Sequence, residues 1–359
     1  MQHLLDLSFE EIEATLVEWG EPRYRAKQIT EWVFHHGATD FDVMTPLPPA
    51  LRARLSEAFT IAAPPVLAER IADDGATTKA LLDLGGNDAV EIVRMAYDPD
   101  EDGAPDRVTV CVSTQVGCAM ACRFCATGLQ GFTRNLSASE IVTQVLHFSR
   151  EAASHGRVTN IVFMGMGEPL ANYAETIAAI RWLTRPEGLG LRQRGITVST
   201  VGLVRAIDRL AEEGLQIGLT ISLHAPDDEL RRDLIPTATG TTIEDLVAAA
   251  RRYIERCGRR VTFAYALLDH VNDEPAQARA LARRIRGIQA HVNLIPYNPT
   301  AGPDLRRPSV GRVRAFQREL QAEGINATVR IERGVEIAAA CGQLRTDVQR
   351  GRMEPIALT

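Results

Sequence analysis

The chain has 359 residues, of which 45% are hydrophobic, 24% are charged and 5% are aromatic. This composition excludes a disordered chain, and the length suffices for one large domain, or for a large and a small one, around a sizeable core. The net charge of −6 argues against a nucleic-acid partner, but it is unevenly divided. Residues 1–106 carry −13, whereas residues 107–359 carry +7 and contain no lysine, so the second part is compatible with such a partner.

The first part of the chain predicts three short helices. Ser8 and Glu11 fit a capping box at the start of a helix in residues 8–20, and further helices are expected in residues 23–34 and 49–59. We assign residues 1–62 to a small N-terminal helical accessory domain, which serves either for packing or for substrate recognition. The N-terminus is acidic, which is not typical of a signal peptide, and no apolar run is long enough to span a membrane. We therefore expect a cytoplasmic protein.

Residues 63–106 are predicted to form a short β-hairpin linker. Two strand-like runs, 79–84 and 90–96, flank a Gly-Gly-Asn turn signal. An acidic loop at 98–106 follows, and we place a domain boundary there.

From residue 107 the pattern changes to β-branched apolar runs that alternate with longer helical stretches. Such alternation predicts an α/β fold with a parallel sheet, and six or seven units favour a partial (β/α)6 barrel over a closed barrel of eight. We assign residues 107–345 to this barrel and residues 346–359 to a C-terminal tail. The expected strands are 108–113, 158–164, 195–199, 216–223, 260–266, 290–295 and 326–331, and the expected helices include 137–153, 202–213, 242–257 and 310–323.

A cysteine motif follows the first strand of the predicted barrel. Cys118, Cys122 and Cys125 have the spacing C-x3-C-x2-C, which brings three thiolates together on a short loop. Three thiolates can hold three irons of a [4Fe–4S] cluster and leave the fourth iron open to an outside ligand. The alternative is a zinc loop, but zinc usually takes four protein ligands, and the next histidine, His147, is 22 residues beyond Cys125.

At these cysteines the chain resembles the radical S-adenosylmethionine (SAM) enzymes, in which SAM binds the open iron. A second motif, Met164-Gly-Met-Gly-Glu-Pro169, ends the next predicted strand and resembles the superfamily's GEP motif. The resemblance implies that Gly167 and Glu168 contact SAM. It also implies SAM-binding positions at the ends of later strands, namely Ser199, Ser222, Leu223, His224 and Asn298.

Motifs along nearly the whole chain resemble a narrower family, the dual-specificity RNA methyltransferases that modify C2 of an adenine in 23S rRNA and in tRNA. They include Cys-Val-Ser-Thr-Gln-Val-Gly-Cys at 111–118, Ser-Leu-His-Ala-Pro at 222–226 and Ala-Cys-Gly-Gln-Leu at 340–344. The resemblance implies that Cys341 carries the methyl group as S-methylcysteine and forms a covalent adduct with RNA. It also implies that Cys111 resolves this adduct as a disulfide and that Glu91 is the base that removes the C2 proton. The loop at 98–106 is longer than we expect for the family.

The resemblance implies 23S rRNA and tRNA as partners and a flavodoxin- or ferredoxin-type electron donor, and we expect a monomer with no membrane partner. Arginines would hold the RNA phosphates, and candidate runs are 192/194, 231/232, 283/284/286 and 306/307. Three alternatives stay open at this stage. They are C8 methylation of the same adenine, as in a related family, a radical-SAM activase or maturase that acts on a protein, and an RNA-binding module with a structural cluster.

Overall fold

A ten-stranded mixed sheet lies at the centre of the described part of the chain. The computed structural model describes residues 1–72, 75–99, 105–150, 156–299, 304–330 and 344. Cys341 and the tail at 346–359 therefore lie outside the described residues. The strand order is β14-β13-β12-β11-β10-β9-β6-β5-β4-β3, so β14 and β3 form the two edges of the sheet.

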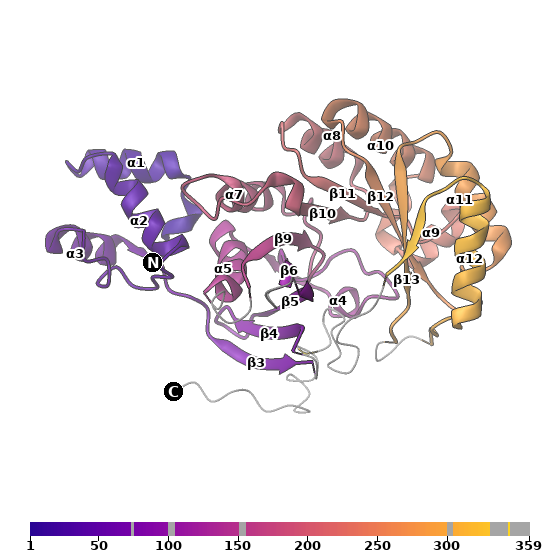
Figure 1. Ribbon diagram of the computed structural model, residues 1–359, viewed down its shortest axis with the longest axis horizontal. Helices are drawn as coiled ribbons and strands as arrows, with labels where there is room; N and C mark the ends of the chain where they lie inside the picture. The colour runs from indigo at the N-terminus through magenta and orange to yellow at the C-terminus, as the bar shows by residue number, and fades with distance from the viewer. Residues whose placement is uncertain (73–74, 100–104, 151–155, 300–303, 331–343, 345–359) are drawn as a thin grey trace.

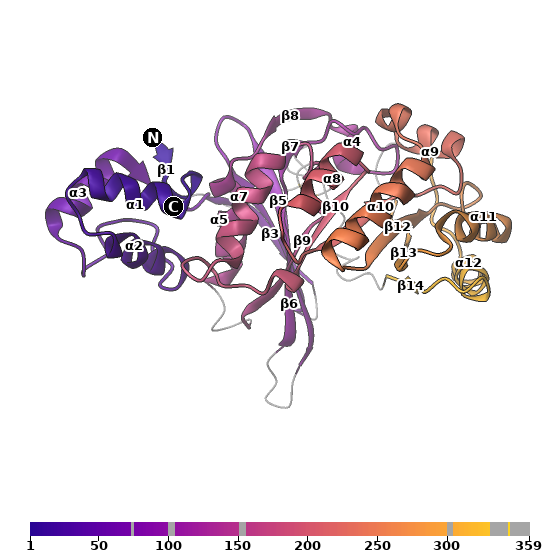
Figure 2. The ribbon, with the colours of Figure 1, turned by 90° about the horizontal axis from the view of Figure 1, so that it is seen from above.

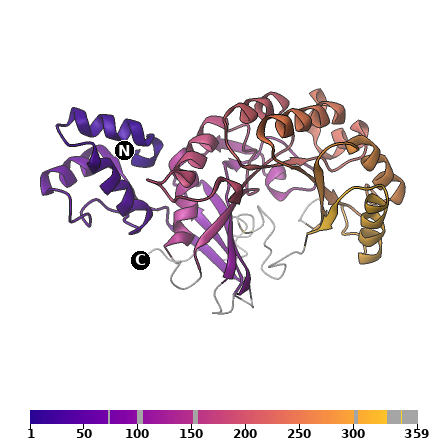
Figure 3. The same cartoon turned by 45° about the horizontal axis from the view of Figure 1, so that its top comes forward.

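Seven neighbouring strands run parallel and confirm the partial barrel. Each is bonded to the next in chain order, and helices connect them on one side. Figure 3 shows the sheet as an open arch with helices along its outer side. The strands are β6 (Pro105–Cys111), β9 (Val158–Phe163), β10 (Ile196–Thr200), β11 (Gly218–Ser222), β12 (Val261–Leu267), β13 (Ala290–Pro296) and β14 (Ala327–Val329).

The connecting helices begin and end where local capping chemistry predicts. Ser137 with Glu140, and Thr242 with Asp245, form capping boxes at the starts of α5 and α10. Gly258 ends α10 in the left-handed conformation with φ +64°, which glycine adopts without strain. The helices between parallel strands are α5 (Ala138–Ser149), α7 (Tyr173–Thr184), α8 (Val204–Glu212), α9 (Asp228–Leu234), α10 (Ile243–Cys257), α11 (Pro275–Ile285) and α12 (Val310–Ala322).

The predicted hairpin is part of the barrel sheet. β4 (Thr77–Asp83) and β5 (Ala89–Pro99) pair antiparallel as expected, and β5 also pairs with β6. A further strand, β3 (Val66–Ile71), which the sequence pattern did not indicate, pairs with β4. β5 and β6 extend to the pair Pro99 and Pro105, so the loop between them is shorter than the predicted 98–106, and their hairpin projects beyond the sheet (Figure 2).

The N-terminal residues form the predicted helical module, at the left of Figure 1. It contains α1 (Phe9–Glu18), α2 (Tyr24–Phe34) and α3 (Pro49–Ala58), together with the short pair β1 (Gln2–His3) and β2 (Phe59–Thr60) and the 3-10 turn η1 (Leu4–Asp6). The capping box of Ser8 and Glu11 is present at α1.

The module docks on the barrel helices α5 and α7. The indole of Trp182 donates to the carbonyls of Leu5 and Leu7, both at 3.1 Å, and stacks on Phe34 with ring centroids 5.5 Å apart. Apolar residues of the module and the barrel belong to one continuous core. Within the described residues, no helix combines the length and apolarity that crossing a bilayer requires.

Candidate active site

Strand register brings side chains from six strands onto one face of the sheet. Residues paired across a ladder, and residues two apart on one strand, point to the same face. The opposite face packs under the helices, so we call this one the inner face. Its members include Lys79 and Leu81 on β4, Glu91 and Val93 on β5, Cys111 on β6, Val162 on β9, Ser199 on β10 and Ser222 on β11.

Glu91, the residue expected to act as a base, lies on the inner face in a buried ion pair. Its Oε2 is 2.8 Å from Nζ of Lys79, and the two side chains are 1% and 0% exposed. The backbone carbonyl of Glu91 accepts from the hydroxyl of Ser113 at 2.7 Å. No motif in the sequence assigns Lys79 a role, although it is one of only two lysines among the 40 lysines and arginines. This rarity was the one available signal.

Cys111 lies on the same face, next to Glu91 on the neighbouring strand. It pairs with Val93 and is 6% exposed, among Val93, Met95 and Met164. Near the other end of this face Leu344 is fully buried and packs with Ala68, Leu81 and Ala89. Cys341, three residues before Leu344 in the sequence, is outside the described residues, and so are its contacts.

The loop that carries the three cysteines is framed by a two-stranded ribbon. β7 (Gln115–Gly117) and β8 (Phe132–Asn135) pair antiparallel, and the amide of Cys118 donates to the carbonyl of Gly131 at 2.7 Å. Gly117 has φ +79°, and a Cβ there would lie 2.0 Å from the oxygen of Gly131, so the closure of the loop requires glycine at this position. The loop ends in the short helix α4 (Ala126–Leu129), directly after Cys125.

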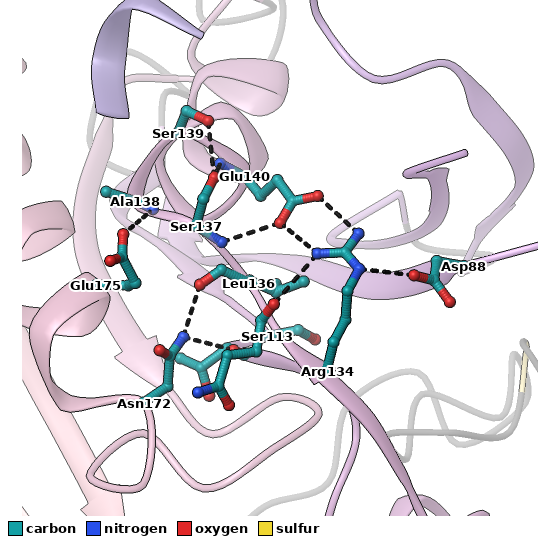
Figure 4. Close-up of polar contacts among 12 residues, drawn as sticks. Asp88, Ser113, Arg134, Leu136, Ser137, Ala138, Ser139, Glu140, Asn172 and Glu175 are labelled. Carbon is teal, nitrogen blue, oxygen red and sulfur yellow. Dashed lines mark hydrogen bonds and ion pairs between the residues drawn. The ribbon is translucent and has the colours of Figure 1, made fainter. Parts of the chain in front are cut away.

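A polar network fixes this ribbon to the barrel (Figure 4). Arg134 of β8 makes a bidentate pair with Glu140 at 2.8 Å for both bonds, and its Nε donates to Asp88 at 2.7 Å. Asn172 donates to the carbonyls of Thr114 and Leu136, on the two sides of the ribbon. The ribbon is therefore held by the turn between β4 and β5, by α5, and by the residue that precedes α7.

The three thiols fit an iron–sulfur cluster. Burial raises the pKa of Cys118 to about 12, and the nearby Cys125 thiolate raises it too. The pKa of Cys122 is also raised, first by burial and then by the charges of Cys125 and Cys118. Three such thiolates need a compensating positive charge, which the irons of a cluster supply. Among the described side chains, no three histidines, cysteines or carboxylates are grouped around a site for a single metal ion.

The GEP segment packs against the strand end that leads into the cysteine loop. The amide of Met166 donates to the hydroxyl of Ser113, and the amide of Glu168 donates to the side chain of Gln115, at 2.9 and 2.8 Å. Gly167 has φ +103°, and a Cβ there would lie 2.6 Å from Cβ of Gln115. The glycine is therefore required by both its conformation and this close approach.

Glu168 is buried between the ends of β9 and β10. Its two carboxylate oxygens accept from the amides of Leu170 at 3.0 Å and Val201 at 2.8 Å. Burial raises its pKa to about 7, although these hydrogen bonds oppose the shift. Each carboxylate oxygen has a second lone pair, so the group retains capacity for a further donor.

The remaining expected SAM positions lie at the same ends of the following strands. Ser199 is on β10, Ser222 is the last residue of β11, and Asn298 follows β13; all three are partly exposed. Leu223 is fully buried.

His224 is held in one tautomer. Its Nδ1 accepts from the amide of Ala266 at 2.8 Å, and burial lowers its pKa to about 3. The neutral ring therefore carries its proton on Nε2. Phe124 of the cysteine loop packs edge-on against this ring, with centroids 4.7 Å apart.

The arginine runs differ in exposure. Arg231 is 1% exposed, so it cannot contact an RNA phosphate at the surface, whereas Arg232 beside it is exposed. The other runs are exposed throughout, at 192/194, 283/284/286 and 306/307.

Comparisons with known sequence families agree with this site. Residues 112–282 match the Radical SAM superfamily, and residues 2–61 match the N-terminal domain of the ribosomal RNA large subunit methyltransferases. The first match begins directly after β6 and includes the three cysteines and the GEP segment. The second coincides with the helical module.

Similarity to individual proteins extends along nearly the whole chain. "Ribosomal RNA large subunit methyltransferase N" of Nitrosopumilus maritimus is 51% identical over 97% of this chain and 99% of its own length. "Probable dual-specificity RNA methyltransferase RlmN" of Chloroflexus aurantiacus is 50% identical over 95% of this chain and 92% of its own. The crystal structure of a radical SAM methyltransferase from Sphaerobacter thermophilus superposes with a TM-score of 0.90 at 50% identity, and covers 96% of this chain and 99% of that one.

Proposed function

Because the chain belongs to the RlmN family of radical SAM ribosomal RNA methyltransferases, we propose that it methylates C2 of an adenine in 23S rRNA and in tRNA. The rRNA target is in the peptidyl transferase centre, and the tRNA target is the adenosine 3′ of the anticodon. The electron-poor C2 carbon cannot attack the methyl group of SAM as a nucleophile, so this reaction needs a radical route.

The cluster ligands and the SAM ligands form one part of the proposed machinery. When bound, the [4Fe–4S] cluster and SAM supply a 5′-deoxyadenosyl radical. Cys118, Cys122 and Cys125 hold the cluster. SAM is held by residues at the strand ends, namely Gly167, Glu168, Ser199, Ser222, Leu223, His224 and Asn298. Glu168 receives the ammonium group of SAM, and the protonated Nε2 of His224 is available as a hydrogen-bond donor.

Two cysteines and a carboxylate form the other part. Cys341 first receives a methyl group from one SAM by displacement, and its S-methyl group then loses a hydrogen atom and bonds to C2 of the adenine. Glu91 removes the C2 proton as the adduct radical gives up its unpaired electron, for which the oxidised cluster would be the acceptor. The thiolate of Cys111 attacks the sulfur of Cys341, so a Cys111–Cys341 disulfide forms as the methylated base leaves.

The observation that carries this proposal is the relative position of Glu91 and Cys111. Cys111 pairs with Val93, and Glu91 is two residues from Val93 on the same strand, so the two groups are diagonal neighbours on the inner face. Such neighbours are about 7–8 Å apart, close enough to act on one adduct. Buried Leu344, three residues after Cys341, packs on this face against Leu81, which pairs with Glu91.

The chain's division and partners are part of the same proposal. Residues 1–62 act as an RNA-recognition domain, and residues 63–106 form the β-hairpin linker region that carries Glu91. Residues 107–345 form the radical SAM barrel with the Cys341 segment, and residues 346–359 form a tail. The exposed arginines of the basic second part contact phosphates. The enzyme works as a cytoplasmic monomer and takes electrons from a flavodoxin- or ferredoxin-type donor.

Nucleoside mass spectrometry tests the product. The anaerobically reconstituted protein is incubated with SAM, a reductant and either unmodified 23S rRNA or tRNA, and the RNA is digested. We expect 2-methyladenosine from both substrates. If 8-methyladenosine is the only product, the C2 assignment is wrong, and if no methylated adenosine forms while 5′-deoxyadenosine does, RNA is not the substrate.

A protein substrate makes a different prediction about Cys341. An activase or maturase has no need of this thiol, whereas methylation through S-methylcysteine stops without it. Cys341→Ala is therefore expected to abolish RNA methylation and retain reductive cleavage of SAM. Cys257→Ala is the matched control, because Cys257 is a buried core residue to which we assign no part in the reaction.

A further inference from the structure

A buried arginine beside the cysteine loop has hydrogen-bonding groups with no partner in the described part of the chain. Arg231 is on α9 and is 1% exposed. Its Nη2 donates to the carbonyl of Val201, but its Nε and Nη1 have no hydrogen-bond partner among the residues that the structure describes. An unsatisfied buried donor is costly, and it is more costly when the group is charged. Two such atoms on one guanidinium point to a ligand other than the described protein groups.

The surroundings of Arg231 identify where that ligand would lie. α9 and the following 3-10 segment η3 (Pro236–Gly240) pack directly on the cysteine loop. The amide of Arg123 donates to the carbonyl of Leu234, and the hydroxyl of Thr237 donates to the carbonyl of Met120, both at 3.0 Å. Leu234, Ile235 and Ala238 form an apolar cluster with Cys122.

The charges near Arg231 point the same way. Burial lowers the pKa of its guanidinium, and the groups that oppose this shift are the charges of Asp228 and Cys122. Asp228 already accepts from the amide of Ile243 at 2.7 Å. Cys122 is therefore the cluster ligand whose thiolate would attract Arg231 once it binds iron, in apolar surroundings where a hydrogen bond to sulfur is poorly screened.

We propose, on the basis of the cluster in the proposed function, that Arg231 donates through Nε and Nη1 to sulfur at the cluster beside Cys122 and so stabilises the cluster after it accepts one electron. Hydrogen bonds to the sulfurs and nearby positive charge both raise the reduction potential of such clusters. Arg231 is thus a positioning and charge-compensating residue of the cluster. Through Val201, whose amide binds Glu168, it also fixes the strand end that carries the GEP contact.

The test is a redox titration of the reconstituted full chain without RNA. The reduced cluster is followed by electron paramagnetic resonance while a low-potential chemical reductant supplies one electron per cluster. Arg231→Gln removes both the positive charge and the planar set of guanidinium N–H donors, whereas Arg231→Lys keeps the charge without those donors. Arg232→Gln is the matched control, because Arg232 is the exposed neighbour on the same helix. Iron content and SAM binding by equilibrium dialysis are measured on each variant.

For Arg231→Gln we expect the ratio of reduced to oxidised cluster at a fixed potential to fall about tenfold, which is ~59 mV for a one-electron couple. The ratio for Arg231→Lys is expected to lie between those of Arg231→Gln and the wild type, and the ratio for Arg232→Gln is expected to equal that of the wild type. If Arg231→Gln binds no iron, the Arg231→Lys titration decides. An unchanged potential in an iron-loaded variant overturns the proposal, and so does weaker SAM binding at an unchanged potential, which assigns Arg231 to the SAM carboxylate. Methylation of RNA by the wild type, measured separately, tests the proposed function.

Discussion

The two sides of the inner face treat buried charge differently. On the side of β4 and β5, Glu91 and Lys79 are both buried and neutralise one another at 2.8 Å. At the ends of β9 to β11, Glu168 and Arg231 are also buried, but each binds backbone groups, and two donors of Arg231 have no partner within the described ranges. We call the region of Lys79 and Glu91 the paired side, and the region of Glu168 and Arg231 the rim side. The buried charges of the paired side compensate one another, whereas those of the rim side lack an oppositely charged partner of this kind among the described side chains.

This difference indicates which buried groups are available to bind a cofactor. A buried pair retains its charges because each partner compensates the other. A buried charge whose partners are uncharged groups is compensated only in part, so the rim side fits the binding of charged groups such as SAM and an iron–sulfur cluster. The paired side fits chemistry that needs a carboxylate held in one position.

The largest expected effect comes from breaking the rim side. Cys122→Ala removes one of three cluster ligands, so we expect loss of the cluster absorbance and of methylation to background. Cys257→Ala, a change at another buried cysteine, is expected to retain both. Iron analysis with the methylation assay checks this, and a Cys122→Ala protein with full iron content would show that the cluster is elsewhere.

Breaking the pair is expected to be costly for stability. Lys79→Met leaves the Glu91 carboxylate buried without its cation, and such changes cost ~3–5 kcal/mol of unfolding free energy. The double variant Lys79→Met with Glu91→Leu is expected to recover most of this loss, because no uncompensated charge remains. Urea denaturation of the cluster-free protein measures both, and a cost below about 1 kcal/mol for the single variant is incompatible with a tight buried pair.

Glu168 is expected to make stability depend on pH. Its pKa of about 7 in the folded chain lies above its ordinary value of 4.5, so between these values the folded state holds a proton that the unfolded chain has released. Stability conferred by this group is therefore present below about pH 4.5 and is lost as the pH rises through 7, by roughly 3 kcal/mol at 1.36 kcal/mol per pKa unit.

The control for this dependence is Glu168→Gln in the cluster-free protein. Urea denaturation between pH 5 and 8 should show a shallower fall in unfolding free energy for the variant than for the wild type. Equal slopes would mean that Glu168 is ionised throughout, and that its hydrogen bonds with Leu170, Val201 and Thr200 compensate its burial fully.

An exposed pair sets the lower limit of the comparison. Glu10 binds Arg185 at 2.9 Å between the N-terminal module and the barrel, and the Glu10 side chain is 70% exposed. Solvent screens this contact, so Glu10→Ala is expected to cost less than ~1 kcal/mol. A thermal melt in low and high salt checks it. A larger cost would mean that the module depends on this pair rather than on the buried contacts of Trp182 with Leu5 and Leu7.

The sequence predicted the parallel barrel because its strands and helices are marked by local patterns. The runs at 158–164 and 290–295, for example, became β9 and β13 within a residue. β3 gave no such signal, since its residues are mostly half-buried at a sheet edge and owe their conformation to pairing with β4. The Lys79–Glu91 pair and the burial of Arg231 depend on contacts between distant segments, so no local pattern could reveal them.

The trapped adduct tests the division between the two sides most directly. Cys111→Ala, Cys122→Ala and the wild type are each reacted with SAM, a reductant and labelled RNA, and covalent RNA–protein complexes are separated on a denaturing gel. We predict a complex that accumulates only in Cys111→Ala, where the radical step is intact and the resolving thiol is absent. Full turnover without a complex in Cys111→Ala, or a complex in Cys122→Ala, would contradict the assignment of the two sides.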